Sequence, residues 1–110
     1  MQDCTDRDIV TVTTTVGSLD DARRLAREIV ERHLAACVQL DAIAASVYRW
    51  DGRLCEDPDV RLSIKTLAGR RAALQAYFAE AHPYELPQFI CERQESSEQY
   101  AAWIEAEVGT

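Results

Sequence analysis

The sequence predicts an α+β domain built on a split βαβ repeat, and three observations lead to this prediction. Strand and helix patterns follow each other in the order β-α-β-β-α-β-α, which with right-handed crossovers gives a four-stranded antiparallel sheet with two helices on one face. Asp51-Gly52 separates two strand-like runs. This dipeptide favours a type I′ hairpin turn, because both central residues need positive φ. The 110 residues, 47% apolar and 28% charged, are typical of one globular domain.

The first strand and helix are predicted at the start of this domain. Residues 1–8 form a polar tail, and residues 9–110 form the single domain. Ile9–Val16 (IVTVTTTV) is almost entirely β-branched, which favours a strand over a helix. Ser18 can then cap an amphipathic helix that the apolar spacing extends to about residue 34.

A long hairpin follows, with its turn at Asp51-Gly52. The phase of the apolar alternation changes between residues 38–40 and 43–47, so we expect a bulge or break near Asp41-Ala42. Pro58 has no N–H to donate to a neighbouring strand. We therefore expect the returning strand to be interrupted there and to resume near Asp59.

The second half of the repeat continues with a helix, a strand and a last helix. Thr66 is the predicted cap of a helix that Pro83 ends, because the residue before a proline avoids helical dihedrals. Residues 88–92 form a short strand candidate after a second proline. Ser96 with Gln99 resembles a capping box and opens the last helix.

The sheet face away from the two helices is expected to carry aliphatic side chains, with only the last helix left to cover them. If this face stayed in contact with water, the fold would lose a burial free energy of about 25 cal/mol per Å² of apolar surface. The hairpin is also long for so short a chain and should reach past its own core. Together these features predict a domain that associates with itself.

Charge and cysteine content narrow the classes of function. The net charge of −7, from 12 basic and 19 acidic residues, argues against a nucleic-acid or anionic-membrane surface and leaves metal cations and basic partners open. The sequence contains no signal-peptide pattern and no apolar run near the roughly 20 residues that a membrane helix needs. Cys4, Cys37, Cys55 and Cys91 form no C-x-x-C pair, so we expect reduced thiols in a cytoplasmic protein.

Five ordered segments resemble the CutA family of divalent-cation tolerance proteins. Residues 32–38 (RHLAACV) resemble its R-L-A-A-C-V segment, and residues 46–53 (SVYRWDGR) resemble its S-x-Y-x-W-x-G-K/R hairpin. Residues 64–66 (IKT), residues 82–87 (HPYELP) and the spaced pair Tyr100 and Trp103 complete the set. The resemblance extends over essentially the whole chain from residue 9 to residue 108.

The resemblance implies a ferredoxin-like fold, similar to that of the PII signalling proteins, in a tight homotrimer whose long hairpins cross between subunits. It also implies binding of copper or other divalent metals and a role in metal tolerance, with no well-defined reaction. Bacterial members for which copper ligation has been proposed carry a cysteine late in the first strand and paired histidines before the proline. This chain has Thr14 and Ala81 there, so His82 alone remains of that soft-ligand set.

His82 is the leading candidate for a metal ligand, since imidazole binds borderline metals and titrates near neutrality. The alternative is that it merely ends a helix beside Pro83. Glu85 lies three residues on and offers a carboxylate that can share an ion or pair with Lys65 or an arginine. The sequence has no Cys/His cluster with metal-site spacing, so we expect weak binding of copper or another divalent cation. Such binding should fade as the pH falls through about 6.5.

The remaining candidates are interface residues and thiols. We expect an inter-subunit pocket or interface to use four amphipathic aromatics, although ordinary core packing is the alternative. They are Tyr48, Trp50, Tyr84 and Trp103. Lys65 either meets an anionic ligand or forms an ion pair. Cys37 is expected to be an inert buried thiol. Cys55 stands where the family more often has an acidic residue, and it could rebuild a soft site elsewhere.

Two functions compete at this point. The first is a trimeric, non-enzymatic metal-tolerance protein, because nothing in the sequence pairs a cysteine with His33 or His82 beside an oxyanion hole. A glycine-rich phosphate loop is also missing from the sequence. The second is a PII-like sensor that binds a small anionic metabolite between subunits.

Overall fold

A computed structural model describes residues 5–109 of the chain. Its four strands form one antiparallel sheet in the order β2-β3-β1-β4, with three α-helices and a short 3₁₀ helix, η1. The predicted order of elements is therefore confirmed. The elements are β1 (Ile9–Val16), α1 (Leu19–Glu31), β2 (Cys37–Trp50), β3 (Arg53–Leu67), η1 (Ala68–Arg70), α2 (Arg71–Ala81), β4 (Ile90–Arg93) and α3 (Glu98–Val108).

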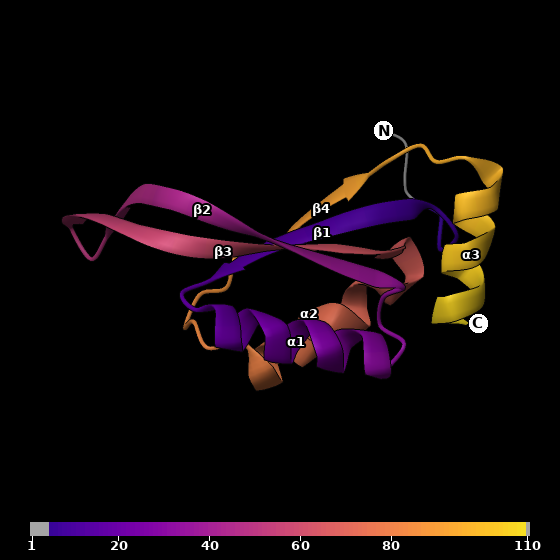
Figure 1. Ribbon diagram of the computed structural model, residues 1–110, viewed down its shortest axis with the longest axis horizontal. Coiled ribbons are helices and arrows are strands. Elements are labelled where there is room, and N and C mark those ends of the chain that lie inside the picture. The colour runs from indigo at the N-terminus through magenta and orange to yellow at the C-terminus, as the bar shows by residue number, and fades with distance from the viewer. Residues whose placement is uncertain (1–4, 110) are drawn as a thin grey trace.

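The core lies between one face of the sheet and the helices α1 and α2, which cover that face together (Figure 1). On β1, every second residue from Val10 to Val16 is fully buried, as expected for a strand with one face on a core. Leu25 and Ile29 of α1 and Leu74 of α2 meet this face and are also fully buried.

The opposite face of the sheet is more polar than expected. The strand register aligns Thr11 with Lys65, Thr13 with Ser63 and Thr15 with Arg61 across β1 and β3. Aliphatic residues occur on this face mainly at its margins, where Ile9 and Leu67 pack against α3. The expected aliphatic residues covered by the last helix are therefore found only at this margin. The centre of the face is polar because the alternation places most aliphatic residues of β1 and β3 on the helix side.

The hairpin projects beyond the sheet as a two-stranded ribbon. β1 pairs with β3 only as far as Val60, so the part of β3 before that residue has β2 as its one neighbour (Figure 1). Asp51 and Gly52 have φ values of 53° and 77°, which confirms a turn with positive φ at both central residues.

The predicted bulge exists, but it lies between Ile43 and Ser46 rather than near Asp41-Ala42. Across from it, Asp57 pairs with Ser46 and Asp59 pairs with Ile43, so Pro58 faces the extra residue on β2. The expected interruption of the returning strand was wrong, since β3 runs through Pro58. The ladder is already irregular at a bulge, so a missing N–H is tolerated there.

The caps show one confirmed prediction and two corrections. Ser18 caps α1, accepting a hydrogen bond from the Asp21 N–H at 3.1 Å. Thr66 does not cap a helix, because it is a buried residue of β3 whose hydroxyl donates to the Leu34 carbonyl at 2.8 Å. Ser97, rather than Ser96, caps α3 by accepting from the Tyr100 N–H at 3.2 Å.

The last strand, β4, also begins later than expected, at residue 90.

Part of the predicted polar tail is attached to the domain. The Ala68 N–H donates to the Asp8 carbonyl at 2.8 Å, and the Gly69 N–H donates to the Asp6 carbonyl at 3.0 Å. Residues 1–4 of that tail, including Cys4, lie outside the described residues.

Candidate functional site

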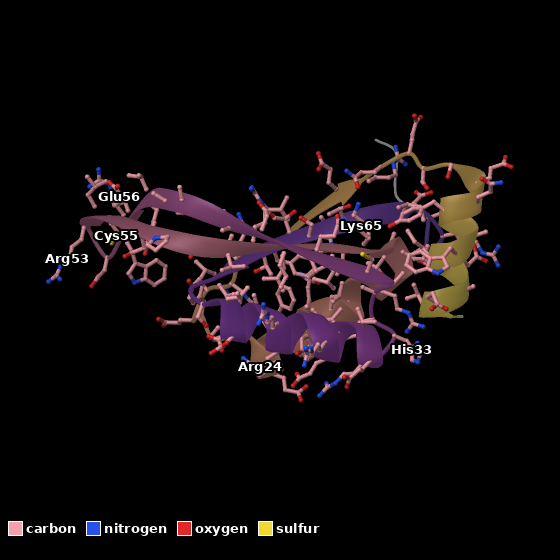
Figure 2. The ribbon with its side chains drawn as sticks, in the orientation of Figure 1. Arg24, His33, Arg53, Cys55, Glu56 and Lys65 are labelled. Atoms are coloured by element: carbon pink, nitrogen blue, oxygen red, sulfur yellow. The ribbon has the colours of Figure 1, made fainter. Side chains whose placement is uncertain are left out.

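The predicted site residues fall in three separate regions. Tyr48 and Trp50 lie in the hairpin, and His82, Tyr84 and Glu85 lie in the loop after α2. Lys65 lies near the other end of β3, and Trp103 lies on α3. Figure 2 shows Lys65 far along the molecule from Cys55, which lies near the tip of the hairpin. The described chain therefore does not bring these residues into one site.

His82 is held at the junction of α2 and β1. It follows the last residue of α2 with an extended backbone (φ −70°, ψ 133°), as expected before Pro83. Its ring packs between two aromatic rings, with centroids 5.3 Å from Phe78 and 5.4 Å from Tyr84. The predicted end of the helix is confirmed, and the same geometry turns the imidazole toward β1.

Both ring nitrogens of His82 have partners. The backbone N–H of Tyr84 donates to Nδ1 at 3.1 Å. In the neutral ring the proton therefore lies on Nε2, which donates to Oγ1 of Thr14 at 2.9 Å. A metal ion can bind Nε2 only by replacing the hydrogen bond to Thr14.

The environment of His82 favours the neutral form of its ring. Burial lowers the pKa of His82 from its usual 6.5, while the backbone of Thr15 and the carboxylate of Asp21 act in the opposite direction. Only the neutral ring can coordinate a metal, and a lowered pKa extends that form to more acidic solution.

Glu85 does not complete a metal site with His82. Its side chain is exposed, and within residues 5–109 no hydrogen bond or ion pair joins it to the imidazole. The same residues contain no group of three or more His, Cys, Asp or Glu side chains that could hold a metal ion. One engaged imidazole beside a threonine hydroxyl does not fit a tight copper site, which draws on thiolate and imidazole together. The His82–Glu85 site stays a prediction.

Two of the predicted interface tyrosines are tied to carboxylates on β3. Tyr84 Oη donates to Asp59 at 3.1 Å, and burial together with Asp59 raises the pKa of Tyr84 to about 12. Tyr48 Oη donates to Asp57 at 2.8 Å, and this bond raises the pKa of Tyr48 to about 12. Sequence reasoning named both tyrosines but missed their partners. The partner of Tyr48 follows from the strand register, whereas the partner of Tyr84 depends on the path of the loop after α2.

The hairpin exposes apolar side chains on both of its faces. Tyr48 and Trp50 share one face with exposed fractions of 43% and 48%. Val47 and Leu54 share the other, with 62% and 74%. Cys55 lies directly opposite Tyr48 in the ladder. An apolar surface of this kind is a candidate for contact with another protein chain.

Lys65 lines a cavity of about 300 Å³ on the open face of the sheet. Ile9 and Thr11 of β1 form one wall, and the segment from residue 94 to Tyr100 forms the other. Among the described residues no carboxylate pairs with the Lys65 ammonium, so the predicted ion pair is not formed within this part of the chain. Trp103 stacks on Tyr100 with ring centroids 5.5 Å apart, outside the cavity lining.

None of the described helices is both long and apolar enough to cross a membrane.

Comparison with known proteins identifies relatives along most of the chain. Residues 10–107 match the model of the CutA1 divalent ion tolerance protein family. The divalent-cation tolerance protein CutA of Thermus thermophilus is 33% identical over 99 residues, which cover 89% of this chain and 96% of that protein. The CutA homolog of Xenopus laevis is 39% identical over 84 residues, and the match covers 76% of this chain and 56% of the frog protein.

Solved structures agree with these matches. CutA from Synechococcus elongatus superposes with a TM-score of 0.89 at 33% identity, covering 97% of this chain and 95% of that one. The backbone of this chain therefore follows that of the Synechococcus elongatus protein over nearly its whole length.

Proposed function

This chain belongs to the CutA1 divalent ion tolerance family, and from that membership we propose that it acts in divalent-cation tolerance as a homotrimer. In this proposal it binds copper and other divalent metals weakly and catalyses no reaction. Its predicted cytoplasmic location belongs to the same proposal.

The hairpin supports self-association. Its two strands expose apolar side chains on both faces, and within the described chain β1 reaches no further along β3 than Val60. Burying such side chains against another subunit is worth about 25 cal/mol per Å². Three subunits, rather than two, come from the family resemblance.

The observation that carries the metal part of the proposal is the pairing of His82 with Thr14 at 2.9 Å. The resemblance assigns a cysteine to the position of Thr14 in members proposed to ligate copper. A hydroxyl is a poor ligand for copper at neutral pH, so one imidazole supplies most of the affinity. The engaged ring must also give up its hydrogen bond before it binds the ion.

Copper titration of the whole protein tests this part. We expect weak binding that falls at least tenfold in His82→Asn, because the substituted amide lacks an imidazole nitrogen. His33→Asn is the matched control, since His33 is the other histidine of the chain and contacts α3 through the Glu107 carbonyl. Tight binding, or loss of binding only in Cys55→Ser, would show that the site lies elsewhere.

A second candidate function is a PII-like sensor of a small anionic metabolite. The observation in its favour is Lys65, whose ammonium lines a cavity without a carboxylate partner among residues 5–109. We expect such a sensor to bind inorganic phosphate or a small carboxylate, and to lose that binding in Lys65→Met. Calorimetric titration at low salt checks this expectation.

A further inference from the structure

Lys65 is the only lysine in the sequence, and the other basic residues are all arginines. The two side chains are not equivalent, because an ammonium is a compact charge with three donors whereas a guanidinium is a planar fork suited to bidentate pairing. In this arginine-rich chain the single ammonium lies on the open face of the sheet, beside a cavity (Figure 2).

The cavity contains one positive and one negative side chain. Lys65 projects from β3, and Glu95 belongs to the segment that connects β4 to α3. Within the described chain neither charge takes part in an ion pair or a side-chain hydrogen bond. A cavity wall that carries two unpaired charges of opposite sign favours a ligand that carries both charges as well.

The rest of the lining is held in place by hydrogen bonds. The Gln94 N–H donates to the Ile9 carbonyl at 2.9 Å, which continues the path of β4 along β1. Thr11 Oγ1 donates to Oε1 of Gln94, and this bond fixes the side-chain amide at the cavity. Ser97 is fixed as the cap of α3. The wall that bears Glu95 is therefore anchored on both sides of that residue.

Size and polarity restrict the ligand further. A volume of about 300 Å³ lies at the lower end of the range for small-molecule sites, which suits an amino acid better than a nucleotide. A doubly charged phosphate would be repelled by Glu95, whereas a single carboxylate paired with an ammonium would not. Ile9 and the ring of Tyr100 offer apolar contact to a side chain.

We propose that this cavity binds a small zwitterion of the amino-acid class, with its carboxylate on Lys65 and its ammonium on Glu95. The inference rests on the second candidate function and changes its ligand from a simple anion to a zwitterion. It is independent of metal binding at His82, which lies in a different region of the molecule.

The single lysine makes a direct experiment possible. In whole protein grown with ¹³C-labelled lysine, one side-chain Cε signal reports on Lys65. We expect L-leucine to shift this signal in a saturable way. N-acetyl-L-leucine, which lacks the ammonium, and L-leucinamide, which lacks the carboxylate, should bind at least tenfold more weakly.

Variants locate the two charges. Glu95→Gln should weaken L-leucine at least tenfold and bring its affinity close to that of N-acetyl-L-leucine, and Lys65→Met should abolish binding measured by calorimetry. Arg53→Met, near the hairpin tip, and Glu105→Gln, on α3 outside this cavity, are matched controls that should bind as the wild type does.

Three results would overturn the inference. Equal shifts with L-leucine and N-acetyl-L-leucine would reduce the site to a simple anion site and leave the second candidate function standing. Binding of inorganic phosphate but not of L-leucine would do the same. No shift with any of these compounds would overturn both the inference and that function.

Discussion

The domain body and the projecting hairpin differ in how far their side chains are buried. In the body, β1 alternates between fully buried and partly exposed residues, and α1 and α2 cover the buried side. Beyond the bulge, β2 is exposed at every residue from Val47 to Trp50, so neither face of the ribbon is covered. The body buries its apolar side chains within this chain, whereas the hairpin leaves its own exposed, as expected for a surface that contacts another chain.

The largest effect should come from a cavity in the body. Leu25 of α1 is fully buried within the main core. Leu25→Ala should lower the free energy of unfolding by about 2–5 kcal/mol, as is usual when a buried leucine is truncated. Denaturant unfolding at a fixed protein concentration measures this loss. A change below about 1 kcal/mol would contradict the idea that the body carries the stability of the fold.

Trp50→Ala tests the other side of the comparison. Truncating an aromatic anchor typically costs an interface about 2 kcal/mol or more, whereas the half-exposed Trp50 contributes little to the body. We expect weaker assembly with unchanged secondary structure. Light scattering over a dilution series should give a mass near three times 12.4 kDa for the wild type and an earlier fall in mass for the variant.

If the wild type has the mass of one chain, the hairpin does not contact another subunit and the proposed self-association is wrong. Arg49→Ala, on the other face of the ribbon from Trp50, is a control for general disturbance of this strand.

A smaller effect is expected from the titration of His82, where the body meets the loop after α2. The folded pKa lies below the unfolded value of about 6.5. The unfolded chain therefore takes up the proton first as the pH falls. The stability contributed by the neutral ring is complete above about pH 6.5 and decreases as the pH falls below that value toward the folded pKa.

Protonation also places a hydrogen on Nδ1, where the ring now accepts from the Tyr84 N–H. The difference in unfolding free energy between the wild type and His82→Asn, followed from pH 8 to pH 5, should shrink on the acidic side. A difference that stays constant over this range would contradict the lowered pKa of His82.

The two smallest effects should come from the hydrogen bonds of Tyr84 and Tyr48 to carboxylates on β3. Tyr84→Phe removes the hydrogen bond to Asp59 from a partly exposed phenol. The free energy of unfolding should fall by less than about 1 kcal/mol. Tyr48→Phe, which removes the bond to Asp57 out on the ribbon, should affect the stability of the body even less. The opposite order would mean that the ribbon and the body unfold as one unit.

What the sequence predicted depends on how far apart the interacting residues are. The turn at Asp51-Gly52 and the cap at Ser18 were predicted because both depend on neighbours within three residues. Thr66 was assigned to a cap because the partner of its hydroxyl, Leu34, lies far earlier in the chain and only the strand pairing brings the two together. The bulge was misplaced for the same reason, since its position depends on where Pro58 falls across the ladder.

The candidate sites also depend on residues that are far apart in the sequence. Thr14 and His82 were linked before the structure only through the family resemblance, and their hydrogen bond spans two distant parts of the sequence. The cavity at Lys65 required the register of three strands together with the path of the chain into α3. No pattern of neighbouring residues in the sequence could have indicated it.

The irregular stretch of β3 opposite the bulge has a further consequence, for aggregation. Between Arg53 and Asp59 the side of β3 away from β2 is a free edge in the described chain, and such edges can recruit strands from other molecules. Three carboxylates and a proline occupy consecutive positions there, from Glu56 to Asp59. Charge repulsion and the missing donor of Pro58 both oppose the addition of a strand. The segment at the base of the ribbon therefore opposes the growth of this edge into a fibre.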